Sequence, residues 1–222
     1  MNAAIKICGL NAREAIEAAA NADFAGFVFY PRSPRNLTPG AAAQLASALP
    51  QAVRRVAVLV DPDDALLQSL LAEFRPDLLQ LHGSEAPGRV AAIRQASGLP
   101  VIKAIPVRDA RDLDAAVAYE DVADWLMFDA KPPRADALPG GNAASFDWNL
   151  LAGRSWRRPW FLSGGLDPAN VAGAIARTGP GAVDVSSGVE HQPGRKDPAR
   201  IVAFIEAVRG ASVTGTPPAA FR

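Results

Sequence analysis

Short apolar segments alternate with amphipathic ones along this chain, and this regular alternation is the feature that most restricts its fold. The apolar segments are rich in β-branched and aromatic residues, which predicts strands, and the segments between them repeat at helical spacing. Strands are predicted in the segment that ends at Cys8 and over residues 26–30, 55–61, 77–82, 100–105, 124–129, 159–163 and 181–185. Helices are predicted over residues 11–21, 38–49, 63–74, 84–97, 109–118, 147–152, 167–177 and 197–208.

This pattern indicates an α/β fold with a single parallel sheet, because parallel strands need crossover connections. Eight strand–helix units close into a (βα)8 TIM barrel, and 222 residues make a compact one compared with the usual ~250. The alternative is an open doubly wound sheet, but no G-x-G-x-x-G dinucleotide turn follows the first strand. We expect one catalytic barrel domain over residues 1–209 and a flexible tail, rich in Thr, Gly and Pro, over residues 210–222.

Composition excludes several classes of partner and location. The formal net charge is zero and no basic block occurs, which argues against nucleic acid and against an anionic membrane surface. No apolar run has the length of a membrane span, and the first residues lack the pattern of a signal peptide. The single cysteine cannot form an internal disulfide and suits a reducing cytoplasm. The sequence leaves open whether the protein is a monomer or a homodimer.

The alternation of side chains along a strand predicts which residues point into the barrel. If the more apolar set of each strand faces the helices, polar residues gather inside, mostly near the carboxyl ends of the strands, where barrels of this kind have their active sites. The inward set is then Lys6, Cys8, Gln80, His82, Lys103, Met127, Asp129, Asp184 and Ser186. For Lys103 and Gln80 the alternative is an interior polar residue without a function. For Cys8 the alternative to a functional residue is a small buried hydrophobic residue.

Two helix starts are visible near these strand ends. Asn11 is the predicted N-cap of the first helix, with Glu14 three residues later, so Cys8 is expected close to a helix N-terminus. Thr38 followed by Pro39 predicts the N-cap and first position of the second helix. A helix N-terminus and the nearby Lys6 both favour a thiolate at Cys8.

Two turns rich in Gly and Ser follow the last two strands, one before a helix opened by Asp167-Pro168 and the other before Glu190. Glycine lets backbone N–H groups approach an anion, and helix N-termini add a favourable field. The loops after strands seven and eight are the recurrent phosphate site of this fold. A phosphorylated small-molecule substrate is therefore expected, with the phosphate bound by Gly164, Gly165, Ser186, Ser187 and Gly188.

On six motifs, this chain resembles the phosphoribosylanthranilate isomerases of tryptophan biosynthesis. The motifs occur in the family's order and span about residues 5 to 208; they are Lys6-Ile7-Cys8-Gly9-Leu10, Ser33-Pro34-Arg35, Leu79-Gln80-Leu81-His82-Gly83, Phe146-Asp147-Trp148, Ser163-Gly164-Gly165-Leu166 and Asp184-Val185-Ser186-Ser187-Gly188-Val189-Glu190. One loop departs from the family's usual Gly-Gly-Thr-Gly, because Ala143 stands at its last glycine position. This change concerns how the loop folds over the substrate, and not the chemistry.

The resemblance implies an Amadori rearrangement by general acid and base, with no cofactor and no metal. In the family's scheme Asp129 is the acid that opens the furanose ring and Cys8 is the base that removes the proton from C2. A carboxyl in a partly desolvated barrel mouth suits an acid. Arg35 is the expected clamp for the anthranilate carboxylate, whereas Arg32 is expected on the solvated surface.

Asp184 is expected to position either Arg35 or the substrate amine, and His82 to line the substrate site or to have a structural role. A rival enzyme on the same barrel, an aminoimidazole-carboxamide ribotide isomerase, typically uses two aspartates, whereas the first strand here provides Cys8. A rival of another class is a non-catalytic phosphosugar-binding barrel, and the presence of both Cys8 and Asp129 argues against it.

Overall fold

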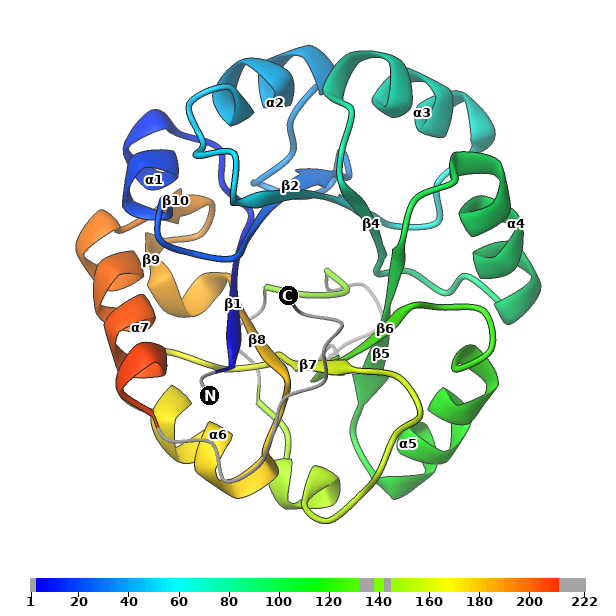
Figure 1. The fold of residues 1–222 in the computed structure, drawn as a ribbon, viewed down its shortest axis with the longest axis vertical. Coiled ribbons are helices and arrows are strands. Elements are labelled where there is room, and N and C mark those ends of the chain that lie inside the picture. Colours follow the sequence, from blue (N-terminus) through cyan, green and yellow to red (C-terminus); the bar gives the residue numbers. More distant parts are fainter. Residues whose placement is uncertain (1–2, 132–137, 142–144, 212–222) are drawn as a thin grey trace.

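The computed structural model describes residues 3–131, 138–141 and 145–211. Eight parallel strands form a closed barrel in sequence order, with the last strand paired to the first (Figure 1). The strands are β1 (Ala4–Cys8), β2 (Phe24–Phe29), β3 (Arg54–Leu59), β4 (Leu78–Leu81), β5 (Val101–Val107), β6 (Trp125–Ala130), β7 (Trp160–Leu162) and β8 (Ala182–Val185). The predicted (βα)8 barrel is confirmed.

Helices surround this barrel, and the last of them, α7, packs beside α1 (Figure 1). The α-helices are α1 (Arg13–Ala18), α2 (Pro39–Ala46), α3 (Asp64–Ser69), α4 (Pro87–Ser97), α5 (Ala110–Ala116), α6 (Val171–Thr178) and α7 (Pro198–Gly210). The other helical segments are η1 (Leu70–Phe74, a π-helix) and the 3-10 helices η2 (Val117–Tyr119), η3 (Trp148–Leu151) and η4 (Ser187–Val189). Within the described ranges, no helix is long and apolar enough to cross a membrane.

Four elements differ from the prediction. The helix expected over residues 147–152 is only the 3-10 turn η3, and α6 begins at Val171 rather than at 167. A hairpin of β9 (Glu190–Gln192) and β10 (Arg195–Lys196) follows β8 and was not predicted, because strands of two or three residues are too short to show periodicity. The helix α7 includes Gly210, the first residue of the expected tail, and residues 212–222 lie outside the described residues.

One of the two predicted caps is confirmed. Thr38 caps α2, since its side chain accepts a hydrogen bond from the Ala41 N–H at 3.3 Å and Pro39 follows it. The prediction for Asn11 is wrong: Ala12 occupies the N-cap of α1 without a side-chain bond. The Asn11 amide instead donates to the Gly194 carbonyl at 2.9 Å, so it ties the start of α1 to the β9–β10 hairpin.

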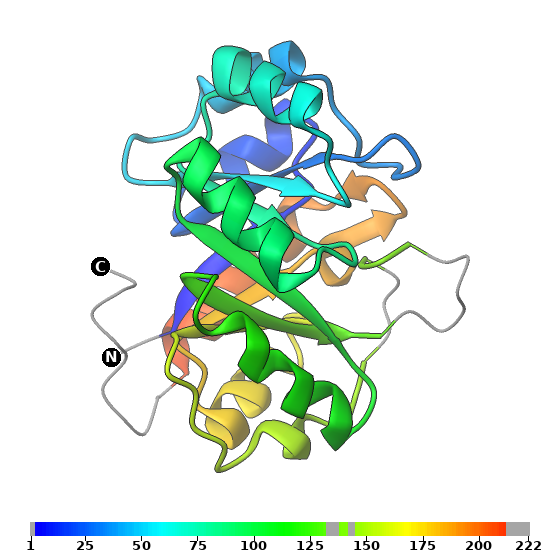
Figure 2. The ribbon, with the colours of Figure 1, turned by 90° about the vertical axis from the view of Figure 1, so that its right-hand side faces the viewer.

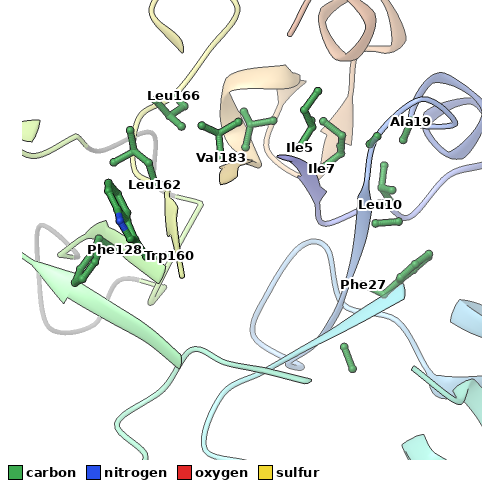
Figure 3. Close-up of a cluster of buried hydrophobic side chains, with 14 of the residues drawn as sticks. Ile5, Ile7, Leu10, Ala19, Phe27, Phe128, Trp160, Leu162, Leu166 and Val183 are labelled. Carbon is green, nitrogen blue, oxygen red and sulfur yellow. The ribbon is translucent and has the colours of Figure 1, made fainter. Parts of the chain in front are cut away.

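The buried apolar residues form two layers, one on each side of the strands. The outer layer lies between strands and helices and includes Ile5, Ile7 and Val183, which Figure 3 shows near the junction of β1 and β8. The inner layer fills the barrel with residues such as Phe24 and Phe161, whose rings meet edge to face at 5.4 Å. The barrel interior is therefore a packed core below the polar strand ends.

Lys103 lies on the opposite side of the sheet from the predicted one. Ile102 and Ala104 belong to the inner layer, and Ile102 pairs in register with inward-facing Gln80, so Lys103 points outward. Its ammonium is buried between strands and helices, where it contacts Glu85 Oε2 and the Gly83 carbonyl, each at 2.8 Å. The prediction failed because apolar residues occur on both faces of β5, which removes the contrast that sets the faces apart.

Replacing Lys103 by Met is expected to destabilise the fold by about 3 kcal/mol, because Glu85 would remain charged and buried without its cation. Lys131→Met is the matched control: its ion pair with Asp112 is partly exposed, so its loss should cost less than about 1 kcal/mol. Urea unfolding of both variants measures the difference. Equal unfolding midpoints for the two variants would show that the buried Lys103–Glu85 pair matters no more for stability than the partly exposed pair.

Candidate active site

Cys8 and Asp129 line one cavity at the carboxyl ends of the barrel strands. Cys8 is the last residue of β1 and Asp129 the penultimate residue of β6, and β7 and β8 lie between these strands in the barrel. Arg35, His82 and Asp184 line the same cavity. Its apolar wall is formed by Val28, Val58, Val60 and Leu138. A small molecule in this space would have a thiol and a carboxyl group on different sides.

A buried ion pair lies directly beside the thiol. Lys6 and Asp184 are register partners across β1 and β8, and Lys6 Nζ is 2.6 Å from Asp184 Oδ1. The Ser163 hydroxyl donates to the other carboxylate oxygen at 3.2 Å. Burial favours the neutral amine of Lys6, but Asp184 and Cys8 outweigh this effect and raise the pKa of Lys6. The lysine therefore remains a cation next to the sulfur.

The expectation of a favoured thiolate at Cys8 is not met. Burial, together with the negative charge of Asp184, raises the pKa of the Cys8 thiol above its ordinary value. Lys6 and Lys196 act in the opposite direction without cancelling these effects. The helix contribution was overestimated as well, since α1 begins only at Arg13.

Arg35 is buried, which excludes a solvated surface role, and its partner is Glu190 rather than Asp184. Nε contacts Glu190 Oε1 and Nη2 contacts Oε2, each at 2.7 Å, so one edge of the guanidinium is fully engaged. Nη2 also donates to the Gly141 carbonyl at 3.2 Å. The proposed link between Asp184 and Arg35 is therefore wrong. Arg32, by contrast, is exposed as predicted.

Glu190 and Lys196 are two site residues that sequence reasoning missed. Lys196 Nζ contacts Glu190 Oε1 at 2.8 Å and the Ser186 carbonyl at 3.0 Å. Burial lowers the pKa of Lys196, although Glu190 opposes this shift. Burial also acts to raise the pKa of Glu190, but the hydrogen bonds and charges of Arg35 and Lys196 outweigh it, so the pKa of Glu190 is lowered. Glu190 ends one of the quoted motifs, so its position was a usable signal, whereas Lys196 depends on an unpredicted hairpin.

Asp129 is held on both sides. Its Oδ1 accepts a hydrogen bond from the Ala130 N–H at 2.9 Å, and its Oδ2 lies 3.0 Å from Nε2 of His82. The other ring nitrogen of His82 lies 2.8 Å from Nε2 of Gln80, which is fully buried. A Cβ atom at Gly140 would lie 2.9 Å from His82 Cε1 and 3.0 Å from Asp129 Oδ2, so this loop lies against the pair.

The two Gly/Ser turns line a second cavity that adjoins the first and shares Asp129 and Ser163 with it. Gly164 has a left-handed backbone with φ of 85°, which favours glycine. At Gly188 a Cβ would overlap the Leu166 carbonyl oxygen, so the turns approach each other too closely for a side chain. Gly165, Ser186 and Ser187 line this cavity too. The helix α6 begins five residues after Leu166, so its N-terminus lies farther from this cavity than expected.

Gly140 and Gly141, the first residues of the unusual loop, line both cavities. Residues 142–144, where the loop departs from the family pattern, lie outside the described residues. Among the residues that the structure describes, no cluster of three or more His, Cys, Asp or Glu could hold a metal ion.

Comparison with known proteins gives a consistent result. The family model described as N-(5'phosphoribosyl)anthranilate (PRA) isomerase matches residues 5–207. The N-(5'-phosphoribosyl)anthranilate isomerase of Paramagnetospirillum magneticum is 57% identical over 208 residues, 93% of this chain and 97% of that one. The crystal structure of the Thermotoga maritima phosphoribosyl anthranilate isomerase has a TM-score of 0.82 at 37% identity and covers 94% of this chain and 99% of that one.

One crystal structure of a phosphoribosyl anthranilate isomerase shows its complex with reduced 1-(o-carboxyphenylamino)-1-deoxyribulose 5-phosphate. It has a TM-score of 0.79 at 35% identity and covers 94% of this chain and 99% of that one.

The thiol of Cys8 is expected to titrate above the ordinary range of cysteine, and Lys196→Met is expected to move its pKa higher still, because a cation that favours the thiolate is lost. Arg195→Met is the control, because Arg195 is an exposed neighbour on the same hairpin, and it should leave the pKa of Cys8 unchanged. The rate of iodoacetamide alkylation against pH measures this directly, since the chain has one cysteine. A Lys196→Met curve that overlays the wild-type curve would contradict the expected influence of Lys196 on the thiol.

Proposed function

The chain belongs to the N-(5'-phosphoribosyl)anthranilate isomerase family, and on that premise we propose that Cys8 and Asp129 are the base and the acid of its reaction. The enzyme converts N-(5-phosphoribosyl)anthranilate to 1-(2-carboxyphenylamino)-1-deoxyribulose 5-phosphate in tryptophan biosynthesis. The observation that supports this assignment best is the shared cavity, because it has the thiol and the carboxyl group in its wall and continues into the two Gly/Ser turns.

The reaction needs two proton transfers on different sides of the substrate. In the first, Asp129 protonates the furanose ring oxygen while the C1–O bond breaks and the amine lone pair forms a C1=N iminium. In the second, the Cys8 thiolate removes the proton from C2, and the electron pair forms a C1=C2 bond as the iminium becomes a neutral amine. Protonation of C1 and loss of the C2 hydroxyl proton then give the ketone, and no electrons are gained or lost overall.

The raised pKa of Cys8 suits this role in one respect. A thiolate that is harder to form is a stronger base once formed, so a small ionised fraction is partly offset by higher basicity. The nearby cations, Lys6 and Lys196, favour the thiolate without being consumed in the reaction. They also favour an anionic substrate in a buried site.

The remaining assignments concern substrate binding. The two turns, with Gly164, Gly165, Ser186, Ser187 and Gly188, are the proposed phosphate site, and the glycine positions allow backbone N–H groups to approach the anion. Asp184 and His82 line the proposed sugar site.

Arg35 is the proposed clamp for the anthranilate carboxylate. Because Glu190 engages Nε and Nη2, the clamp would use the other edge, Nη1 and Nη2, where the Gly141 carbonyl now accepts. Glu190 fixes the guanidinium plane, so little side-chain entropy would be lost on binding.

The enzyme is proposed to work in the cytoplasm, as a monomer or a homodimer. The one cysteine is free and buried, which suits a reducing compartment. The substrate is a phosphorylated small molecule.

Cys8→Ala and Asp129→Asn are each expected to lower kcat by roughly a hundredfold to ten-thousandfold, because each removes one proton transfer. KM should remain near the wild-type value, since neither variant alters the turns or Arg35. Fluorescence of the anthranilate group follows turnover continuously. Wild-type kcat in either variant would refute the role given to that residue.

Arg35→Ala is expected to raise KM by about tenfold or more while kcat changes less, because a buried, charge-assisted contact to the substrate carboxylate is lost. Arg32→Ala, an exposed arginine of the same loop, should leave both constants unchanged. The comparison uses the same fluorescence assay. An unchanged KM in Arg35→Ala would show that the carboxylate binds elsewhere.

A further inference from the structure

Gln80, His82 and Asp129 form a hydrogen-bonded chain from the barrel core to the site. The amide of Gln80 is 2.8 Å from Nδ1 of His82, and Nε2 of His82 is 3.0 Å from Asp129 Oδ2. Gln80 is fully buried, and its Oε1 has no hydrogen-bond partner within the described ranges. Leaving a buried polar group unpaired costs about 1–3 kcal/mol. The reversed amide would leave two N–H donors unpaired in place of one oxygen, so the orientation with the nitrogen toward His82 is the less costly one.

This geometry determines the position of the ring proton. An amide NH2 can only donate, so Nδ1 of His82 must accept, and the proton of the neutral imidazole lies on Nε2. Nε2 then donates to Asp129 Oδ2, which accepts as the carbonyl oxygen of the protonated acid and equally as an oxygen of the carboxylate left after proton transfer. The other charged groups around the cavity have partners of their own: Arg35 has Glu190, Asp184 has Lys6, and Glu85 on the neighbouring loop has Lys103.

We propose that Gln80 and His82 are positioning residues for Asp129: Gln80 fixes the Nε2–H tautomer of His82, and His82 orients the carboxyl group and stabilises the carboxylate left after ring opening. This inference rests on the proposed function, because it assumes that Asp129 is the acid. In this proposal His82 acts through Asp129 rather than through the substrate. Gln80 then has a function, whereas the alternative considered from the sequence was an interior polar residue without one.

The position of Gly140 supports this role. Its Cα lies so close to the His82–Asp129 pair that a Cβ would meet both residues at 2.9–3.0 Å. The hydrogen bond between them is thus covered by backbone, and both residues are largely buried, with 14% and 9% of their side chains exposed. A hydrogen bond to a charged group is stronger when water is excluded.

The tautomer is measured by nitrogen NMR of 15N-labelled histidine. The chain has two histidines, so His191→Gln, an exposed substitution, leaves His82 as the single ring signal. In the His191→Gln protein we expect a proton on Nε2 of His82 and none on Nδ1. When Gln80→Leu is added to this protein, we expect a mixture of the two tautomers. A proton on Nδ1 in the parent, or no change with Gln80→Leu, would overturn the proposal.

Kinetics test the consequence for turnover. His82→Leu is expected to lower kcat on the order of a hundredfold with KM within about twofold, as for the loss of one donor to developing charge. His82→Gln keeps an N–H donor of similar reach and should recover most of this loss, which a merely structural role would not predict. Equal kcat in both variants, corrected for the folded fraction by circular dichroism, would overturn the proposal.

These outcomes separate the inference from the proposed function. If Asp129→Asn retained wild-type turnover, the acid assignment would fail whatever the His82 tautomer. If Asp129→Asn were inactive while His82→Leu turned over normally, Asp129 would remain the acid and the positioning role would be rejected.

Discussion

The ion pair between Lys6 and Asp184 is the interaction on which both the barrel closure and the site depend. The two residues are register partners on β1 and β8, the strands whose pairing closes the sheet. Because side chains alternate, a shift of one strand by one residue in this register would place one of the two charges in the apolar outer layer and leave the other buried without its partner. The same contact sets the charge beside Cys8, since Lys6 favours the thiolate and Asp184 opposes it.

The charged residues of the site are buried and paired, and their pairing explains how they can be near one another. Lys6 has Asp184, whereas Arg35 and Lys196 share Glu190. Such pairs are weak contributors to stability, because desolvation offsets most of the attraction, but removing one partner is costly. Each pair therefore fixes the relative position of the elements that carry its members.

The β9–β10 hairpin carries two of these paired residues, Glu190 and Lys196. It lies at the end of the barrel where the loops after the strands gather (Figure 2). Glu190 begins the hairpin and Lys196 ends it, and Asn11 is tied to Gly194 between them. A segment of seven residues therefore connects the loop after β1, the arginine after β2 and the turn after β8.

The amino-acid sequence was enough to predict the strand count, the inward positions of Cys8, Gln80, Asp129 and Asp184, and the two Gly/Ser turns. These features depend on periodicity and on local backbone requirements, which neighbouring residues largely fix. Three features became visible only in the folded protein: the face of β5 that carries Lys103, the carboxylate that holds Arg35, and the direction in which the pKa of Cys8 shifts. Each of these depends on residues distant in the chain, through strand register, ion pairing and burial.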